Sequence, residues 1–328
     1  MRSLGLMPFE NALSQVIRAY DKLFSAGAVT LETLRASRPV CRFVFGKDGR
    51  ALVGKFFINP WPSGPKDRGL LKEYQVYRKA LALGLTGGVI PRLVGRLPEA
   101  RLGLLLEAVP GYDLDHYLHN AVHHGGLTEC FARLQRLAEL LAFFHTRPLT
   151  RRAVTFAAAL TYFQKLVGQL ESQGLLSVSE KNLLEEESRA WSQIFGRYDD
   201  HQVLLHGDAT PTNFLFPDGR AVALDLERLR AGDRLFDLSW VAGELCHAWG
   251  FRGLDFRASE PAIRLFFRAY LEALPKGPPA AERIFALNPF YMALAELRIA
   301  RNDYLSWDYR RALLKEACQC LTYGRMSL

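Results

Sequence analysis

His206-Gly207-Asp208-Ala209-Thr210-Pro211-Thr212-Asn213 is followed a short way along the chain by Ala223-Leu224-Asp225-Leu226-Glu227. The two stretches read H-G-D-x-x-x-x-N and D-x-E. Apolar runs at residues 203–205 and 221–224 precede the aspartates, and such runs predict short buried strands. The pattern therefore predicts a polar loop between strands that presents two aspartates and one asparagine.

The order of these polar residues is typical of a kinase catalytic loop. In such a loop the first Asp accepts the proton of the attacking hydroxyl, while the Asn and the second Asp hold metal ions at the phosphates. This interpretation makes Asp208 the catalytic base and Asn213 and Asp225 the metal ligands. An isolated Asp would indicate only a turn or a helix cap, but the complete order is far more specific.

The loop resembles that of the aminoglycoside phosphotransferase and choline kinase group of the protein-kinase-like superfamily. Gly207 stands where most eukaryotic protein kinases have Arg, as in that group. The segment Gly232–Leu238 is similar to the group's G-D-P-x-x-D-L motif, with Arg234 in place of the proline. The resemblance implies that Asp237 is a buried residue that braces the catalytic loop, and we expect His206 to support the loop as well.

The resemblance extends over most of residues 35–245 and implies a bilobal, protein-kinase-like α+β fold. A small N-terminal lobe with an antiparallel sheet would precede a mainly helical large lobe. Residues 1–108 would hold an N-terminal helix and the nucleotide-binding small lobe. Residues 109–328 would hold the catalytic loop and the acceptor site.

Three β-rich stretches predict the first strands of the small lobe, at residues 29–34, 40–45 and 51–58. The loop at residues 35–39 contains no glycine, whereas a glycine-rich loop normally closes over the phosphates with its backbone amides. Ser37 or Arg38 would have to substitute for those amides.

Lys55 lies within the third predicted strand, between apolar neighbours. In a kinase this lysine contacts the α- and β-phosphates and pairs with a Glu on the next helix. The helix predicted over residues 69–83 offers Glu73 for that pair. The alternatives are an exposed strand lysine with a surface glutamate, or a role for Lys47, which lies in a predicted turn.

The apolar strand predicted over residues 102–108 leads into Pro110-Gly111. This is similar to the linker between kinase lobes, where backbone groups bind the adenine edge. Glu107, Ala108 and Val109 are therefore candidate nucleotide-binding positions, although Pro110-Gly111 reads equally well as an ordinary turn.

Helical periodicity dominates the rest of the chain. The predicted helices cover residues 127–145, 153–172, 179–198, 238–249, 262–274, 281–300 and 307–323. His116, His119, His123 and His124 crowd one segment, where a solvated helix is favoured over a metal site. His145 ends a predicted helix and is expected to be structural, and the helix dipole would favour its protonated form.

One polar cluster stands out near the C-terminus, at residues 296–304. Helical spacing would put Glu296 and Asp303 on one face and Arg298 and Arg301 on another. Arg298, Arg301 and Asp303 are the hypothesised acceptor-binding residues, with a solvated charged face as the alternative.

The composition of the chain indicates which classes of binding partner it favours. The net charge of +8 favours anionic partners and argues mildly against a polycationic substrate such as an aminoglycoside. The five scattered cysteines do not form a disulfide framework, and we expect a reducing, cytoplasmic location. No apolar run spans a bilayer, and no compact basic or aromatic-basic motif indicates nucleic-acid binding.

The expected reaction is transfer of the γ-phosphoryl group of ATP, with Mg²⁺, to a hydroxyl of a small molecule such as a sugar or an amino alcohol. The alternatives are a kinase for a lipid-linked or lipopolysaccharide sugar, with contact to an anionic membrane, and a nucleotide-binding pseudokinase. The glycine-free loop is the main argument for the pseudokinase.

Overall fold

The computed structural model describes residues 15–16, 29–35, 40–45, 51–56, 67–149, 151–253, 255–275 and 280–328. The chain divides into two compact units. The first unit draws on Met1–Gly111 and Val222–Glu227, and the second on Tyr112–Ala221 and Arg228–Leu328. The segment that carries Asp225 thus clusters with residues far earlier in the chain.

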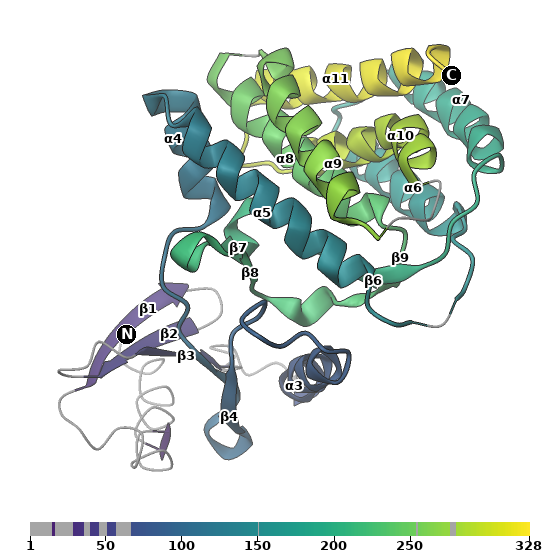
Figure 1. Ribbon diagram of the computed structural model, residues 1–328. Helices are drawn as coiled ribbons and strands as arrows, with labels where there is room; N and C mark the ends of the chain where they lie inside the picture. Colours follow the sequence, from purple (N-terminus) through teal and green to yellow (C-terminus); the bar gives the residue numbers. More distant parts are fainter. Residues whose placement is uncertain are drawn as a thin grey trace. The chain divides into compact units, whose positions relative to one another are not determined.

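The first unit is built on a five-stranded antiparallel sheet in the order β1-β2-β3-β5-β4 (Figure 1). The strands are β1 Val29–Arg35, β2 Val40–Phe45, β3 Ala51–Phe56, β4 Leu93–Leu97 and β5 Leu102–Glu107. Helix α3 (Asp67–Ala82) contacts β5, and its Tyr77 hydroxyl donates a hydrogen bond to the carbonyl oxygen of Pro91, just before β4. The short strand β8 (Val222–Ala223) also belongs to this unit.

The alternation of side chains along strand β3 determines the face of the sheet on which Lys55 lies. Leu52, Gly54 and Phe56 are buried on one face, so the alternation of a strand turns Lys55 to the other face. Gly54 is needed because a Cβ there would lie 2.9 Å from the ring of Phe43. The tight packing of this face holds the strand that carries the lysine.

Helices form most of the second unit (Figure 1). They are α4 Leu114–His124, α5 Leu127–His145, α6 Ala157–Ser172, α7 Val178–Phe195, α8 Leu235–Gly253, α9 Glu260–Ala273, α10 Ala280–Ala300 and α11 Trp307–Met326. Helix α10 contacts α6, α8 and α11, and its Leu287, Phe290 and Leu294 are buried in the core. Strand β6 (Val203–Leu205) pairs with β9 (Arg230–Gly232), and β7 covers Phe214–Leu215.

The small antiparallel sheet and the mainly helical remainder confirm the predicted α+β class. Strands β4 and β9 were not predicted. Helix α8 begins at Leu235, earlier than predicted, because the Asp233 side chain accepts a hydrogen bond from the Leu235 amide at 3.1 Å. Ser37, Arg38 and Lys47 lie outside the described residues.

Candidate active site

The loop that carries Asp208 is held by one buried carboxylate. Asp237 accepts hydrogen bonds from the backbone amides of His206 at 2.7 Å and Gly207 at 2.9 Å. Its side chain is 1% exposed, and His145 Nε2 lies 3.3 Å from it. Burial alone would raise the pKa of Asp237, but these hydrogen bonds and the nearby histidines outweigh burial and lower it. Asp237 therefore stabilises the loop as a carboxylate.

His145 was expected to be structural, with the helix dipole favouring its protonated form, but its surroundings oppose that form. His145 is buried, with Nδ1 2.8 Å from the Tyr270 hydroxyl. Burial lowers the pKa of His145 and outweighs the opposing effect of Asp237. Desolvation is the stronger influence because this end of α5 faces the core, where solvent does not stabilise an imidazolium.

His206 and Gly207 shape the loop just before Asp208. His206 is fully buried, and its Nδ1 accepts a hydrogen bond from the Asp208 amide at 3.3 Å. Gly207 has a φ of 81°, and a Cβ there would lie 2.3 Å from the carbonyl oxygen of Arg228. A side chain at position 207 would therefore displace the backbone of the loop.

Asn213 ties the far end of the same loop to its start. Asn213 ends the 3₁₀ turn Pro211–Asn213, and strand β7 begins at the next residue, Phe214. The Nδ2 of Asn213 donates to the carbonyl oxygen of Asp208 at 2.9 Å and to Thr210 Oγ1 at 3.1 Å. Because both bonds use the amide nitrogen, the oxygen Oδ1 is left as the group that can coordinate a cation.

Asp208 borders a cavity of about 640 Å³ within the second unit. Its side chain is 22% exposed, and Arg228 Nη1 lies 3.6 Å from its Oδ1. The lining combines polar residues with the aromatic side chains Tyr162, Phe236 and Trp240. A cavity of this size accommodates a small organic molecule beside the carboxylate.

Lys55 lies between two carboxylates in the first unit. Its Nζ donates to Glu73 Oε1 at 2.5 Å and to Asp225 Oδ1 at 2.7 Å. Burial alone would lower the pKa of Lys55, but the two carboxylates outweigh burial and raise it. The ion pair predicted between strand and helix is thus present, and the lysine remains protonated. The backbone of Asp225 has a φ of 52°, a strained conformation that functional residues often hold.

The segment predicted to bind the adenine edge, Glu107 to Val109, lies at the end of β5 and just after it. The amide of Glu107 donates to the carbonyl oxygen of Arg92 at 3.0 Å, and the amide of Ala108 donates to that of Ala51 at 2.9 Å. The Glu107 side chain forms an ion pair with Arg92. Since these bonds use the amides of Glu107 and Ala108, the Val109 amide is the better candidate donor to an adenine edge.

The C-terminal polar cluster is only partly brought to the cavity. Arg298 and Arg301 line it, whereas Asp303 is exposed and does not. The predicted shared face of Glu296 and Asp303 is wrong, because α10 ends at Ala300 and helical spacing stops there. Glu296 is instead fully buried, and burial raises its pKa well above the usual range.

Two further cavity residues, Arg228 and Arg230, were not predicted. Both arginines come shortly after Asp225 in the sequence, and this closeness to a predicted site residue could have marked them as candidates. Their position depends on β9, which starts at Arg230 and pairs with β6 just before the catalytic loop. This pairing brings two arginines beside Asp208.

Arg234 stands in place of the proline of the G-D-P-x-x-D-L motif and pairs with Asp200. Its guanidinium donates to both carboxylate oxygens of Asp200, at 2.8 and 3.0 Å, and to the Tyr270 hydroxyl at 3.3 Å. The residue is buried, so this bidentate pair satisfies its charge. The departure from the motif therefore stabilises the segment before α8.

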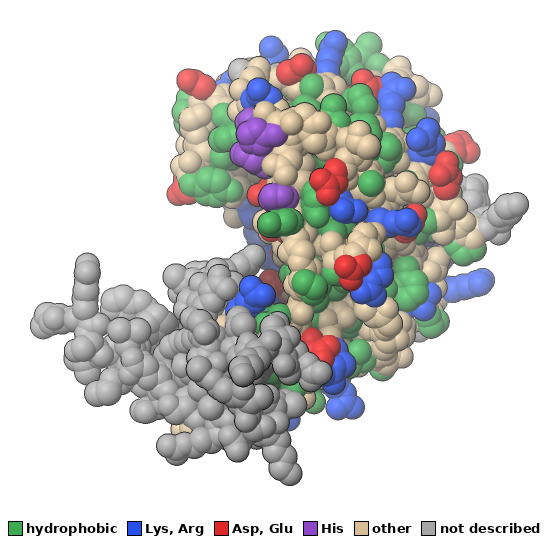
Figure 2. All heavy atoms as spheres, turned by 60° about the vertical axis from the view of Figure 1, so that its left-hand side comes forward, with side chains coloured by type: hydrophobic (Ala, Val, Ile, Leu, Met, Phe, Trp, Pro, Cys, Tyr) green, Lys and Arg blue, Asp and Glu red, His purple; other side chains and the backbone are tan. Residues whose placement is uncertain are grey.

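The histidines of α4 gather on one patch of the surface (Figure 2). The rings of His119 and His123 have centroids 4.5 Å apart. Among the described residues, no cluster of three or more His, Cys, Asp or Glu side chains is arranged to hold a metal ion.

The described helices also include none that is long and apolar enough to cross a bilayer.

Comparison with known proteins agrees with this arrangement. A sequence model described as a phosphotransferase enzyme family matches residues 36–284, which is well over half of the chain. This match confirms the resemblance to the aminoglycoside phosphotransferase and choline kinase group. No curated protein sequence matches significantly.

Solved structures share the fold. A glucosamine kinase has a TM-score of 0.58 at 18% identity, covering 93% of this chain and 82% of its own. Choline kinase LicA from Streptococcus pneumoniae has a TM-score of 0.55 at 16% identity, covering 96% and 99%. The ADP-bound aminoglycoside phosphotransferase APH(2'')-Ib has a TM-score of 0.56 at 15% identity, covering 94% and 99%.

Proposed function

The chain belongs to the phosphotransferase enzyme family, and from this premise we propose that it transfers the γ-phosphoryl group of ATP to a hydroxyl group of a small molecule. The observation that carries the proposal is the braced loop that presents Asp208 to a cavity of about 640 Å³. The ADP-bound aminoglycoside phosphotransferase of the same fold supports ATP as the donor.

In the proposed reaction Asp208 orients the acceptor hydroxyl and receives its proton. The acceptor oxygen forms a bond to the γ-phosphorus, and the bond from that phosphorus to the bridging oxygen of ADP breaks. ADP leaves with the electron pair of that bond. The rate gain in such a transfer comes mainly from positioning and electrostatic stabilisation, which a rigid loop supplies.

Lys55 is proposed to bind the α- and β-phosphates. The geometry supports this role because Glu73 and Asp225 fix the ammonium group and keep it charged. The Val109 amide is proposed to bind the adenine edge. Each of these groups would act on the nucleotide and not on the acceptor.

Asn213 and Asp225 are proposed to hold Mg²⁺. Both offer oxygen donors, which Mg²⁺ prefers, and the hydrogen bonds of Asn213 Nδ2 leave its Oδ1 for a cation. When bound, the ion would neutralise charge on the phosphates. Removal of divalent cations by EDTA should therefore abolish transfer, and added Mg²⁺ should restore it.

The proposal is tested by transfer of label from γ-labelled ATP into the small-molecule, lipid and protein fractions of a cell extract. Asp208→Asn should reduce transfer about a thousandfold, which corresponds to about 4 kcal/mol of transition-state stabilisation. Asp218→Asn, an exposed residue in the turn after β7, is the matched control and should leave transfer unchanged.

Label that enters the small-molecule fraction and disappears with Asp208→Asn would establish the proposed activity. Label in the lipid fraction would assign a lipid-linked acceptor instead. A protein that binds ATP and transfers label to no fraction would contradict the proposal and favour a nucleotide-binding scaffold.

A further inference from the structure

The cavity beside Asp208 has an unusual charge for a site that accepts a hydroxyl compound. Its charged lining residues are four arginines and two aspartates, namely Arg228, Arg230, Arg298, Arg301, Asp208 and Asp233. The arginines come from two separate parts of the chain, the segment after Asp225 and the end of α10. The concentration of guanidinium groups around one small cavity needs an explanation beyond solubility.

Some of these charges are already compensated inside the protein. Asp233 is buried and binds Arg283 at 2.5 Å and the Tyr291 hydroxyl at 2.7 Å. Arg298 forms an ion pair with Glu244, and its guanidinium lies 5.2 Å from the centre of the Trp240 ring. These two residues therefore contribute little net charge to the cavity.

Arg228 faces Asp208, with its Nη1 3.6 Å from Oδ1, so these two charges offset each other. Arg230 and Arg301 are the other charged residues of the lining. Arg301 donates to a neutral group, Gln169 Oε1, at 3.3 Å, and Arg230 Nη1 lies 3.5 Å from the carbonyl oxygen of Gly207. Neither contact supplies a negative charge, so the cavity has an excess of positive charge.

This excess decides which acceptors the cavity favours. An acceptor with an amine would bring a further cation among guanidinium groups in a partly desolvated cavity, where like charges repel. A phosphate or carboxylate would instead accept paired hydrogen bonds from arginine. The side chains of Phe236 and Trp240 offer apolar surface for the carbon skeleton of the same molecule.

We propose that the acceptor is an alcohol that also carries an anionic group, a phosphate monoester or a carboxylate, which Arg230 and Arg301 bind while its hydroxyl faces Asp208. This inference rests on the proposed phosphotransferase function. It assigns a substrate class opposite in charge to choline and the aminoglycosides, the compounds after which two of the similar kinases are named.

The first test determines the charge of the acceptor before its identity is known. Small molecules from a cell extract are passed over a strong anion-exchange resin at neutral pH. The flow-through and the salt eluate, after desalting, are then offered separately to the enzyme with γ-labelled ATP. Label transfer that depends on Asp208 and occurs only with the eluate supports an anionic acceptor.

Transfer with the flow-through alone would overturn the anionic acceptor and leave the phosphotransferase function standing. Transfer with neither fraction would overturn the phosphotransferase function itself, so the two failures are distinguishable. Treating the eluate with alkaline phosphatase, then removing the phosphatase, separates the two chemical sources. Loss of acceptor activity identifies a phosphate monoester, and its survival identifies a carboxylate.

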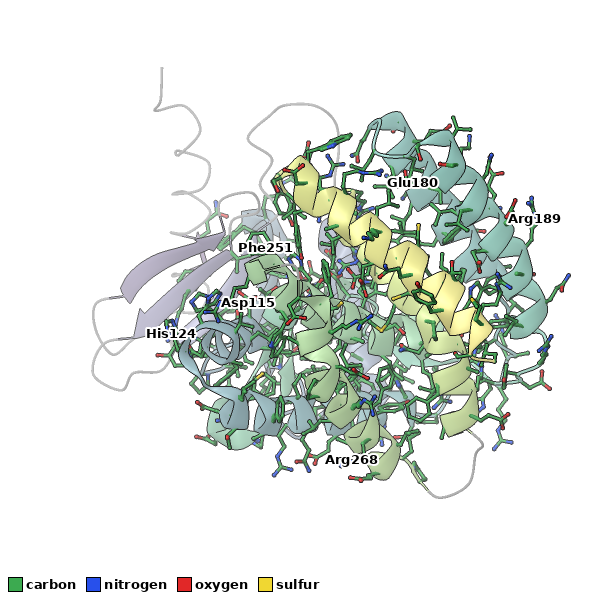
Figure 3. The ribbon with its side chains drawn as sticks, turned by 90° about the horizontal axis from the view of Figure 1, so that it is seen from above. Asp115, His124, Glu180, Arg189, Phe251 and Arg268 are labelled. Carbon is green, nitrogen blue, oxygen red and sulfur yellow. The ribbon has the colours of Figure 1, made fainter. Side chains whose placement is uncertain are left out.

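The second test asks whether the arginines act on the acceptor or on the nucleotide. Arg301→Gln and Arg230→Gln should each raise the KM for the eluted acceptor about tenfold to a hundredfold, the usual effect of losing a charge-assisted hydrogen bond. The KM for ATP should stay unchanged. Arg268→Gln on α9 is the matched control, because this arginine is exposed and lies outside the cavity (Figure 3).

An equal rise in the KM for ATP would show that the arginines bind the nucleotide and would overturn the assignment. Unchanged KM values for both substrates in both variants would overturn it too. Arg301→Lys keeps the charge but loses the paired geometry, so it should restore part of the acceptor affinity.

Discussion

At Gly207 the backbone has a φ of 81° and passes so close to Arg228 that a Cβ would lie 2.3 Å from its carbonyl oxygen. We expect Gly207→Ala to lower the free energy of unfolding by about 1–3 kcal/mol, because it adds left-handed strain to a clash with backbone. Turnover should fall further than stability alone explains, since the loop that orients Asp208 must move. Urea denaturation and label transfer measure the two effects.

Gly168→Ala in α6 is the control for this substitution, because nothing lies within 4 Å of the added Cβ. Alanine there should leave turnover unchanged and stabilise the helix by about 0.5–1 kcal/mol. Wild-type turnover in Gly207→Ala would show that the loop tolerates a side chain at this position.

The candidate site was predictable from the sequence where its residues follow one another along the chain. The loop motif selected Asp208, and the kinase pattern of a lysine within an apolar strand followed by a helix glutamate selected Lys55 and Glu73. Arg228 and Arg230 were missed because their relation to Asp208 depends on the pairing of β9 with β6, across a long intervening segment. Spacing along the sequence does not contain that pairing.

At the scale of helices, Glu180 links the start of α7 to α11. Its carboxylate accepts hydrogen bonds from Arg311 at 2.7 and 2.9 Å and completes a capping box with Ser177. The bonds from Arg311 are the largest cause of a pKa lowered from 4.5 to about 2. Because the pKa is depressed in the folded state, this stabilisation is present above pH 4.5 and is lost as the pH falls toward 2.

We therefore expect Glu180→Gln to lower the free energy of unfolding by about 1 kcal/mol at pH 7, an amount typical of such partly exposed pairs. The difference from the wild type should shrink between pH 4.5 and pH 3, where the wild type begins to lose the same interaction. Urea denaturation across this range measures it. Glu186→Gln, an exposed residue on the same helix, is the control, and a difference that does not change with pH would contradict the assignment.

The helices were predicted better than the short strands. Helices α5 and α11 have long apolar stripes, so periodicity alone places them within a few residues. Strands β4 and β9 are short and partly exposed, and they become strands only through pairing with β5 and β6. The prediction of a face shared by Glu296 and Asp303 assumed that the helix continues to Asp303, but α10 ends at Ala300.

At the scale of the whole molecule, the residues with proposed roles belong to both compact units. The first holds Lys55, Glu73 and Asp225, and the second holds Asp208 with its arginine-lined cavity. Lys55, proposed to bind the nucleotide phosphates, thus belongs to one unit, and Asp208, proposed to orient the acceptor, belongs to the other, together with the proposed metal ligand Asn213. Substitution of Lys55 should therefore weaken the binding of ATP, whereas substitution of Asp208 should not.

This separation predicts a difference between Lys55→Met and Asp208→Asn in the stabilisation that ATP provides. A ligand at a hundred times its Kd stabilises the folded state by about 2.7 kcal/mol, and ATP with Mg²⁺ should do so for the wild type. Asp208→Asn should keep this increment because its carboxylate serves the acceptor, whereas Lys55→Met should lose most of it. The increment is compared with that of each unliganded variant, because Lys55→Met also leaves Glu73 and Asp225 without their shared cation and lowers stability by itself. Lys72→Met, exposed on α3, is the control, and an increment that survives in Lys55→Met or disappears in Asp208→Asn would contradict the division of roles.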